Sequence, residues 1–422
     1  MEELRRLYGD RFILHVGWMF GSVILASDPE AIQQIFTSSK FRSTGQATRQ
    51  FTGPFLGTRS VVSARGERHR RKRKLLLPPF HRERLQTYPQ RIRELSDRAI
   101  RQQIPGIGFS IRPLAQSITL QVIMDVVLGE CANGRDRVLR EHLKNWSEAI
   151  ASPIVTSSIL FEPLRDLPDW TPWGQFRHLS ETIDELLYAE IRHRRSHLDP
   201  HRPDILTLLL QARDENGDPL EDDEIRDELM TLLISGQETA ATAIAWAMYW
   251  IHRNPSVRDR LIAELDGLGP DPDPLEMMKL PYLDAVCSET LRFYPPTPLT
   301  SQFEATEPVE FGDCLLQPGT RVSICIYLVH HREDLYPEPK QFKPERFLDR
   351  KFSQYEYLPF GGGSRRCIGE ALATMEIKMV VGTLLSRYRL EMLTQMPVQP
   401  RFRGFVLLAP DRDIRFVCLG RR

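Results

Sequence analysis

Apolar residues recur along most of this chain with the spacing of amphipathic helices. They fall three and four residues apart, close to the helical turn, over 83–103, 115–128, 137–150, 176–194 and 203–213. The pattern over Asp222–His252 is apolar on most faces from Leu229 onward, so we expect this helix at the centre of a large domain. Shorter helices are expected, each with proline at or near one end, over 28–35, 68–77 and 283–293.

Short β-strands are predicted near the N-terminus and late in the chain. The runs FILHVG and SVILAS indicate a hairpin that turns through Trp18–Gly21. Further strand signals lie near 309–324, and a coil rich in proline and aromatic residues covers 336–360. A long helix from near Cys367 and strand-like pieces complete the order, which no linker interrupts. We therefore expect one mainly α domain over 1–422, with a small β-rich region in approximately 8–50 and 297–330.

Composition sets broad limits on the kind of protein. Hydrophobic residues make up 41% and charged residues 27%, which is ordinary for a globular protein and shows no signature of disorder. Basic and acidic residues each number 56, so the net charge of zero names no polyanionic partner. The most apolar early stretch, Phe12–Ala26, is too short to span a membrane and lacks a signal-peptide cleavage site. No membrane span is expected.

Cysteine usage points to a reducing compartment. The cysteines are scattered, at positions 131, 287, 314, 325, 367 and 418, and form no CxxC pair. Neither a disulfide framework nor a zinc site is indicated, and a cytoplasmic location fits best. The default interpretation of each cysteine is a small buried hydrophobic residue.

Cys367 stands in a motif of its own. Residues 360–369 read FGGGSRRCIG and fit the pattern FxxGxRxCxG. This pattern is the haem-binding signature of the cytochrome P450 family, which the chain resembles over nearly its whole length. The resemblance implies the cytochrome P450 fold and haem b, with the Cys367 thiolate as axial ligand, a ligand that favours O–O cleavage. Taken alone, the motif would also suit a buried cysteine in a glycine-rich turn.

The residues around Cys367 suit such a ligand. Gly361, Gly369 and the glycines at 362 and 363 let the backbone approach sulfur and porphyrin closely. Backbone N–H groups pointing at the sulfur would moderate its charge. The helix predicted to start near Cys367 is expected to lower the pKa of the thiol. By the resemblance, Arg365 reaches a haem propionate and Phe360 packs beside the thiolate.

A second motif is ExxR, formed by Glu289 and Arg292, whose spacing places them on one helix face. Alone it is a weak signal, because most such pairs are solvated surface ions. The segment FKPERF follows at 342–347. In the family, an arginine at the position of Arg346 completes a buried Glu–Arg–Arg network behind the haem. The resemblance thus implies a structural role for these three residues.

A third motif lies inside the long apolar helix, where residues 235–239 read SGQET. The family pattern is small-Gly-x-acid-Thr. The resemblance implies that Thr239 hydrogen-bonds bound oxygen and that Glu238 relays protons. Gly236 costs roughly 1 kcal/mol inside a helix, and a local opening of the helix over the iron would explain it. The alternative is a tolerated glycine beside a satisfied threonine.

The segment 66–80, GERHRRKRKLLLPPF, is strongly basic. A nucleic-acid interpretation is weakened because no aromatic stacking residues interleave the cations. By the resemblance, His69 and Arg73 face haem propionates. The other cations, Arg70, Arg71, Lys72 and Lys74, would form a basic face that steers an acidic ferredoxin or flavodoxin. A solvated surface is the alternative for these four. A propionate arginine that many relatives carry is absent near Gln302 and Phe303.

Substrate contacts are inferred from the resemblance alone, to a bacterial branch that includes cyanobacterial fatty-acid and terpene oxidases. The expected pocket segments are mostly apolar, include Trp170 and Trp173, and suggest a lipophilic fatty acid, terpenoid or polyketide. Core packing is the alternative for each. The named candidates are Phe51, Phe55, Leu56, Leu232, Ser235, Thr297, Pro298, Leu299 and Val406.

The resemblance therefore implies a monooxygenase that uses O2 and electrons from a separate ferredoxin or flavodoxin-type protein. A haem-thiolate peroxygenase, isomerase or oxidative-coupling enzyme is the first alternative, and retention of Glu238 and Thr239 favours oxygen activation instead. A non-catalytic haem binder and a helical protein without haem are the remaining alternatives.

Overall fold

The computed structural model describes residues 1–15, 21–44, 53, 56–80, 85–131, 134–160, 166–213, 217–404 and 406–422. Its helices are α1 (Glu2–Tyr8), α3 (Pro29–Thr37), α5 (Gly66–Leu76), α7 (Tyr88–Arg101), α8 (Ile111–Val127), α9 (Arg135–Ala149), α10 (Pro153–Leu160), α11 (Pro172–Ser196), α12 (Ile205–Gln211), α13 (Asp222–Arg253), α14 (Pro255–Asp266), α15 (Pro274–Met277), α16 (Pro281–Phe293), α17 (Ile326–His330), α18 (Arg346–Asp349) and α19 (Glu370–Arg387). Single 3₁₀ turns are η1 (Pro78–Phe80) and η4 (Gly363–Arg365). The strands are β1 (Arg11–His15), β2 (Ser22–Ala26), β3 (Phe41–Ser43), β4 (Gly108–Ser110), β5 (Phe303–Ala305), β6 (Val309–Phe311), β7 (Cys314–Leu316), β8 (Arg321–Ile324), β9 (Tyr388–Met392), β10 (Pro400–Arg403), β11 (Leu407–Pro410) and β12 (Arg415–Arg421).

The mainly helical fold with small sheets is confirmed, and each predicted helix is found with its ends shifted by a few residues. Helix α8 begins at Ile111, earlier than predicted, because Pro113 falls in the first turn, where a missing N–H leaves no helical bond broken. The hairpin is confirmed as β1 and β2, with Ile13 opposite Ile24. Of its predicted turn, Trp18–Gly21, only Gly21 lies within the described residues.

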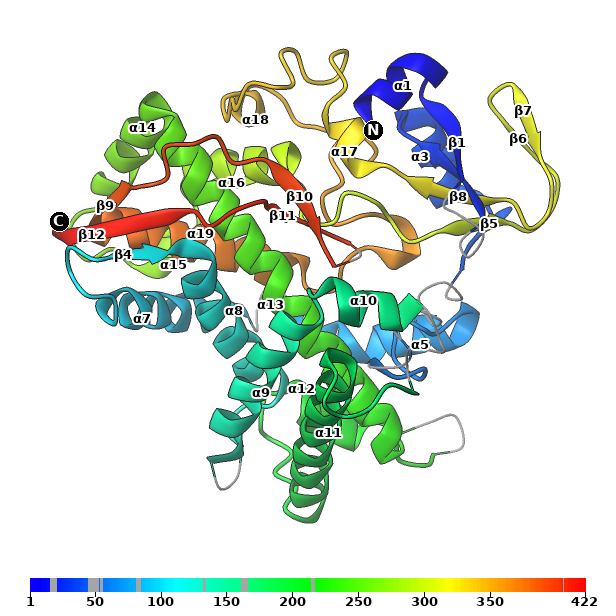
Figure 1. Ribbon diagram of the computed structural model, residues 1–422, viewed down its shortest axis with the longest axis horizontal. Coiled ribbons are helices and arrows are strands. Elements are labelled where there is room, and N and C mark those ends of the chain that lie inside the picture. Colours follow the sequence, from blue (N-terminus) through cyan, green and yellow to red (C-terminus); the bar gives the residue numbers. More distant parts are fainter. Residues whose placement is uncertain are drawn as a thin grey trace.

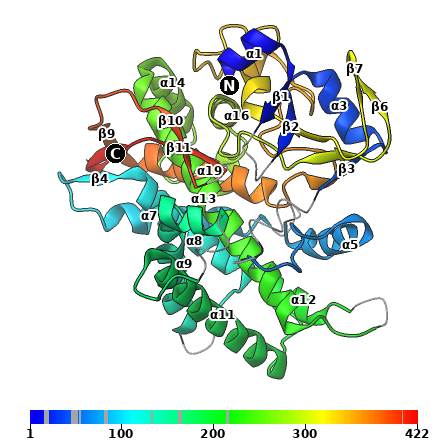
Figure 2. The ribbon, with the colours of Figure 1, turned by 45° about the vertical axis from the view of Figure 1, so that its right-hand side comes forward.

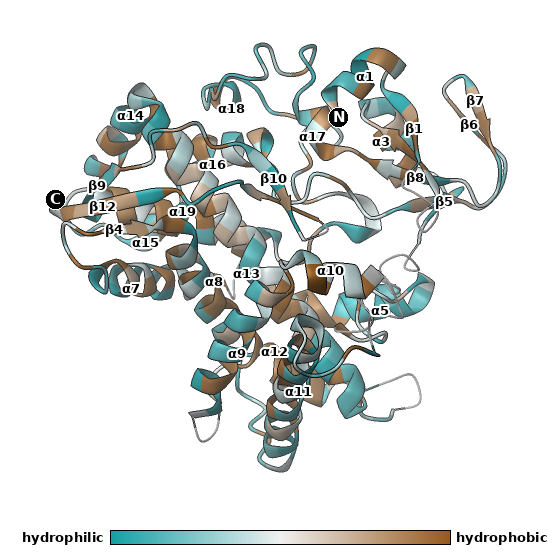
Figure 3. Cartoon of the chain, in the orientation of Figure 1, coloured by the Kyte–Doolittle hydropathy of each residue, from teal (hydrophilic) through white to brown (hydrophobic). Residues whose placement is uncertain are grey.

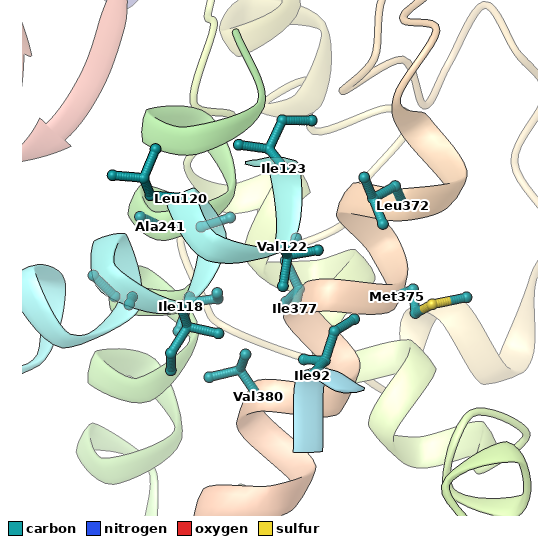
Figure 4. Close-up of a cluster of buried hydrophobic side chains, with 14 of the residues drawn as sticks. Ile92, Ile118, Leu120, Val122, Ile123, Ala241, Leu372, Met375, Ile377 and Val380 are labelled. Atoms are coloured by element: carbon teal, nitrogen blue, oxygen red, sulfur yellow. The ribbon is translucent and has the colours of Figure 1, made fainter. Parts of the chain in front are cut away.

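The long helix α13 crosses the middle of the molecule, as the apolar pattern predicts (Figure 1). It packs against α8, α19, α16 and α11. The close-up in Figure 4 shows this core, where Val122 of α8, Ala241 of α13 and Ile377 of α19 meet beside Ile92 of α7. All four side chains are fully buried or nearly so. Burial of apolar surface from several helices therefore fixes α13 relative to α8 and α19.

The larger sheet joins the two ends of the predicted β-rich region. Its strand order is β1-β2-β8-β5-β3, and β2 pairs in parallel with β8 whereas the other pairs are antiparallel. In Figures 1 and 2 the sheet lies beside α3, on the opposite side of the molecule from the strands β4, β12 and β9. Helix α3 starts at Pro29 after Asp28, whose carboxylate accepts the Ala31 N–H at 2.9 Å. A separate apolar cluster between α3 and the sheet includes Ile32 and Ile324.

Outer helices such as α5 and α14 are rich in hydrophilic residues, whereas apolar residues concentrate in the interior (Figure 3). Over the described part of the chain, no helix has both the length and the apolarity needed to cross a bilayer.

Candidate active site

The cysteine loop, Phe360–Gly369, runs directly into α19. It is closed by a hydrogen bond from the Cys367 N–H to the Phe360 carbonyl at 3.0 Å. Gly361 and Gly363 have φ of 66° and 60°, a left-handed conformation that favours glycine. Gly362 lies against α3, where an added Cβ would meet the Phe36 ring at 2.2 Å. The glycine run is therefore required by both backbone conformation and close packing.

Cys367 is solvent-accessible, but the surrounding protein is dense enough for burial to raise the pKa of its thiol. The Gly369 N–H lowers that pKa in part, and the Glu370 carboxylate raises it again. The predicted lowering of the thiol pKa was wrong. Helix α19 begins only at Glu370, so Cys367 lies before its first turn, and the burial of the thiol outweighs the hydrogen bond from Gly369. Bonding to a metal ion would be needed to hold this sulfur as a thiolate.

Three cationic or basic side chains gather near the loop. His69 is buried, and burial together with Arg365 and Arg73 lowers its pKa to about 4. Burial lowers the pKa of Arg73, while the nearby Cys367 raises it. Arg365 donates to the carbonyls of Val61 at 3.0 Å and Ala64 at 2.5 Å. No hydrogen-bond acceptor is found for Arg73 within the described residues, so a half-buried cation here suits an anionic group such as a haem propionate.

Lys72 does not belong to the exposed basic face predicted for α5. Its side chain is only 6% exposed, and its ammonium pairs with Glu228 at 2.9 Å and also with Glu224, both on α13. Lys72 follows His69 by three residues and precedes Leu76 by four, so helical geometry places it on the buried face with them. Arg70 and Lys74 are exposed, whereas Arg71 is partly buried and donates to the Arg213 carbonyl.

The middle of α13 differs from the rest of that helix. Ser235 is exposed and Thr239 partly exposed, although the residues of the turns before and after are almost all buried. The Thr239 hydroxyl donates to the Ser235 carbonyl at 3.0 Å. The predicted opening at Gly236 is not seen, because α13 is continuous through it. A Cβ at Gly236 would lie 2.7 Å from the Ile123 side chain, so close packing of α8 accounts for the glycine.

Glu238 turns toward α8 rather than into open space. Its carboxylate accepts a hydrogen bond from Arg112 at 2.5 Å and another from the amide of Gln116. Arg403 of β10 also lies within electrostatic reach of Glu238. Arg112 and Gln116 are not predictable from the sequence, because a cation and an amide on a neighbouring helix carry no motif of their own.

The residues of the ExxR motif form a buried cluster with Arg346. Arg292 donates from Nε and Nη2 to the two oxygens of Glu289 at 2.7 and 2.8 Å, and both residues are 0% exposed. Arg346 lies 3.2 Å from the same carboxylate, which also accepts the Lys343 N–H at 2.8 Å. The carboxylate is thus fully satisfied, as a buried charge requires.

The predicted substrate residues are placed less uniformly. Leu56, Leu232 and Pro298 are buried, Thr297 is partly buried, and Leu299 and Val406 are 37% and 64% exposed. Phe51 and Phe55 lie outside the described residues, and so does Phe405, which directly precedes Val406. Trp173 packs on Phe176 with ring centroids 5.6 Å apart, and Trp170 is 79% exposed. These positions favour core packing for Trp173 and leave Trp170 at the surface.

Among the described residues there is no group of three or more His, Cys, Asp or Glu that could hold a metal ion. A metal bound at Cys367 would therefore not find a set of three such side chains within the described part of the chain, and would need further ligands. A porphyrin provides them, and the half-buried guanidinium groups of Arg73 and Arg365 beside the cysteine loop fit its carboxylates. The residues present thus fit a haem held through sulfur.

Comparisons with known proteins agree with this chemistry. The family model described as cytochrome P450 matches residues 1–416. Cytochrome P450 135B1 of Mycobacterium bovis is 34% identical, with 97% of this chain and 85% of the relative covered. Cytochrome P450 138 of the same species is 31% identical, with 96% and 88% covered. Retinoic-acid-bound cyanobacterial CYP120A1 superposes with a TM-score of 0.84 at 25% identity, covering 99% of this chain and 93% of that one. The cytochrome P450DA haem domain gives 0.86 at 22% identity, with 100% and 92% covered, a likeness of fold.

Proposed function

The chain belongs to the cytochrome P450 family of haem-thiolate monooxygenases, and we propose that it oxidises a lipophilic small molecule. The proposed substrate classes are fatty acids, terpenoids and polyketides, and the proposed electron donor is a separate ferredoxin or flavodoxin-type protein. The observation that carries the proposal is that two of the apolar candidate residues, Leu299 and Val406, are 37% and 64% exposed. Partly open Ser235 and Thr239 on α13 complete the proposed pocket.

Cys367 would hold the haem iron, and His69, Arg73 and Arg365 would face the propionates. Haem supplies the activation of O2 and the transfer of one oxygen atom to substrate. The Gly369 N–H would moderate the charge on the sulfur, because it is the hydrogen bond that favours the ionised form. Phe360 is partly buried against the core and would limit water near the sulfur.

Proton supply is assigned to the middle of α13. The Thr239 hydroxyl would serve as a proton donor at this point of the helix, which requires Oγ1 to leave the Ser235 carbonyl. Glu238 would first leave Arg112 and Gln116, which occupy its carboxylate in the structure, then take up a proton from solvent and pass it to this region.

Support for a lipophilic substrate also comes from one relative. CYP120A1 is described with bound retinoic acid, a long apolar molecule that ends in a carboxylate, and the two chains align over nearly their whole lengths. Retinoid-like and fatty-acid-like compounds are therefore the first to test.

The experiment is a screen for spin-state shifts in the haem-loaded protein. Lipophilic compounds of graded length should displace water from the site and shift the Soret band, with saturation at micromolar concentrations. Polar analogues of equal size serve as controls. A protein that responds to polar compounds and not to any lipophile would contradict the proposed substrate class. Turnover with hydrogen peroxide in place of the electron donor would favour the peroxygenase alternative.

A further inference from the structure

His330 lies at the end of α17, between the Glu289–Arg292 pair and the cysteine loop. The residue is 0% exposed, and its ring stacks on Tyr357 with centroids 5.4 Å apart at 23°. Burial and the nearby Arg292 guanidinium hold the pKa of His330 well below its usual value. The imidazole is therefore neutral. No motif in the sequence singles out this histidine.

Hydrogen bonds join His330 both to Arg292 of the buried ion pair and to Leu358, which precedes the cysteine loop. Its carbonyl accepts Arg292 Nη1–H at 2.7 Å, so it lies directly on the buried ion pair. Its ring Nε2 accepts the Leu358 N–H at 3.0 Å. Leu358 is 2% exposed, so this N–H has no access to water and depends on the ring for its acceptor.

From Leu358 the hydrogen bonds continue to the metal ligand. The Leu358 carbonyl accepts the Gly361 N–H at 2.9 Å, which closes the turn that opens the cysteine loop. The Phe360 carbonyl in that turn accepts the Cys367 N–H at 3.0 Å. The position of Leu358 therefore sets the turn, and the turn sets the backbone of Cys367.

The tautomer of His330 follows from these contacts. Because Nε2 accepts, the ring proton is on Nδ1, and the backbone at Leu291 and Arg292 of α16 interacts favourably with the protonated ring. Holding the Leu358 N–H is the role that the contacts offer.

We propose that His330 is a positioning residue for the thiolate ligand, through the hydrogen bond between its Nε2 and the Leu358 N–H. The proposal rests on the proposed function, in which Cys367 binds haem iron. His330 touches neither haem nor substrate and acts only through the turn at 358–361. The buried Glu289–Arg292–Arg346 cluster then anchors the cysteine loop, through the hydrogen bonds of His330 to Arg292 and to Leu358.

The test compares variants of the haem-loaded protein. His330→Phe keeps a ring of similar size and loses the acceptor, whereas His330→Gln offers Oε1 close to the position of Nε2. His331→Phe is the matched control. It alters an adjacent buried histidine whose Nδ1 bonds the Tyr327 carbonyl and does not reach the cysteine loop. His330→Met replaces His330→Phe if the latter does not fold.

The readouts are the reduced-CO band of thiolate-ligated haem, its rate of conversion to the band of the thiolate-free form, and the midpoint of urea unfolding. His330→Phe should convert roughly tenfold faster than the unsubstituted protein, the effect of losing one buried hydrogen bond. His330→Gln should restore most of the difference. His331→Phe should lower the urea midpoint without speeding conversion.

Two outcomes would overturn the proposal in distinguishable ways. If His330→Phe and His331→Phe lower the urea midpoint equally and both convert at the unsubstituted rate, His330 is merely structural. If the unsubstituted protein itself never shows the thiolate band, the proposed function fails, and the positioning role fails with it.

Discussion

An ideal Cβ atom added to Gly362 would lie 2.2 Å from Cε2 of Phe36. The backbone at Gly362 is extended, with φ of −164°, so any residue could adopt it and only space forbids a side chain. Gly361 is the reverse case, since φ is 66° and nothing lies within 4 Å of an added Cβ. Two adjacent glycines are thus required for different physical reasons.

These reasons predict different responses to substitution. Gly362→Ala should lose about 1–3 kcal/mol of unfolding free energy through overpacking, and Phe36→Leu in the same chain should restore part of it. Gly361→Ala should lose roughly 1–2 kcal/mol through backbone strain, and Phe36→Leu should not help it. Urea unfolding of the four variants measures this. Equal rescue of both would show that Phe36 is not the obstacle at Gly362.

Thr239 can be tested against a neighbour on the same helix. Thr239→Ala should leave electron consumption close to normal and divert most of it from product to peroxide, because the proton at Oγ1 is lost. Thr242→Ala is the control, since Thr242 is fully buried and its hydroxyl has no partner in the described part of the chain. Product and peroxide per electron pair are the measurements. Unchanged coupling in Thr239→Ala would remove the threonine from proton supply.

At the scale of elements, the predictions succeeded where a pattern repeats along one segment. Helix α13 and the hairpin β1–β2 follow from periodicity alone, because each buries a face that the pattern marks. The cysteine loop follows from a local motif with fixed spacing. The predicted exposure of Lys72 is wrong, because Lys72 lies on the buried face of α5 and its partners, Glu224 and Glu228, are remote in sequence. Arg112 and His330 were missed since their contacts are tertiary.

Helix α5 therefore carries cations of two kinds, and they should respond differently. Lys72→Met leaves Glu228 as a buried carboxylate without its cation, so the free energy of unfolding should fall by about 3–5 kcal/mol. Lys74→Met, on the exposed face, should change it by less than about 0.5 kcal/mol.

Reduction by the electron donor tests the same distinction. Lys74→Glu should slow reduction by an acidic partner at low salt and leave stability nearly unchanged, because the exposed face steers encounter. Equal reduction rates for Lys74→Glu and the unsubstituted protein at low salt would exclude Lys74 from the docking face.

At the scale of the whole molecule, buried histidines link stability to pH. Burial lowers the pKa of His252 and of His331 from 6.5 to about 4. Between these values the unfolded chain binds protons that the folded protein does not, so stability falls as pH decreases from about 6.5 toward 4. Each group would account for about 3 kcal/mol across that window. Above pH 6.5 neither histidine contributes to the pH dependence of stability, because both are neutral in the folded and the unfolded state.

The measurement is the urea midpoint at pH 7 and pH 5. His252 bonds the Met248 carbonyl through Nδ1 and lies against Phe416, and a glutamine can keep the first contact without titrating. His252→Gln should therefore reduce the loss of stability between the two pH values. An identical loss in both proteins would show that His252 does not set the acid response.

The expectation of one domain over 1–422 stays a prediction, and so does each residue role at the haem. The family and fold are established by the comparisons and the observed architecture. The apolar faces predicted from periodicity are buried in the described part of the chain. The identity of the substrate depends on side chains such as Phe51 and Phe55, which lie outside the described residues.

The parallel pairing of β2 with β8 sets an order on biosynthesis. Ile24 leaves the ribosome early, yet its strand partner Val322 is made only after the long central helix and most of the core. Until then β2 keeps one open hydrogen-bonding edge, which other nascent chains could occupy. Because contacts of such long sequence separation form late, closure of this sheet is expected to be a slow step in refolding, and dilute conditions should improve recovery of the native protein.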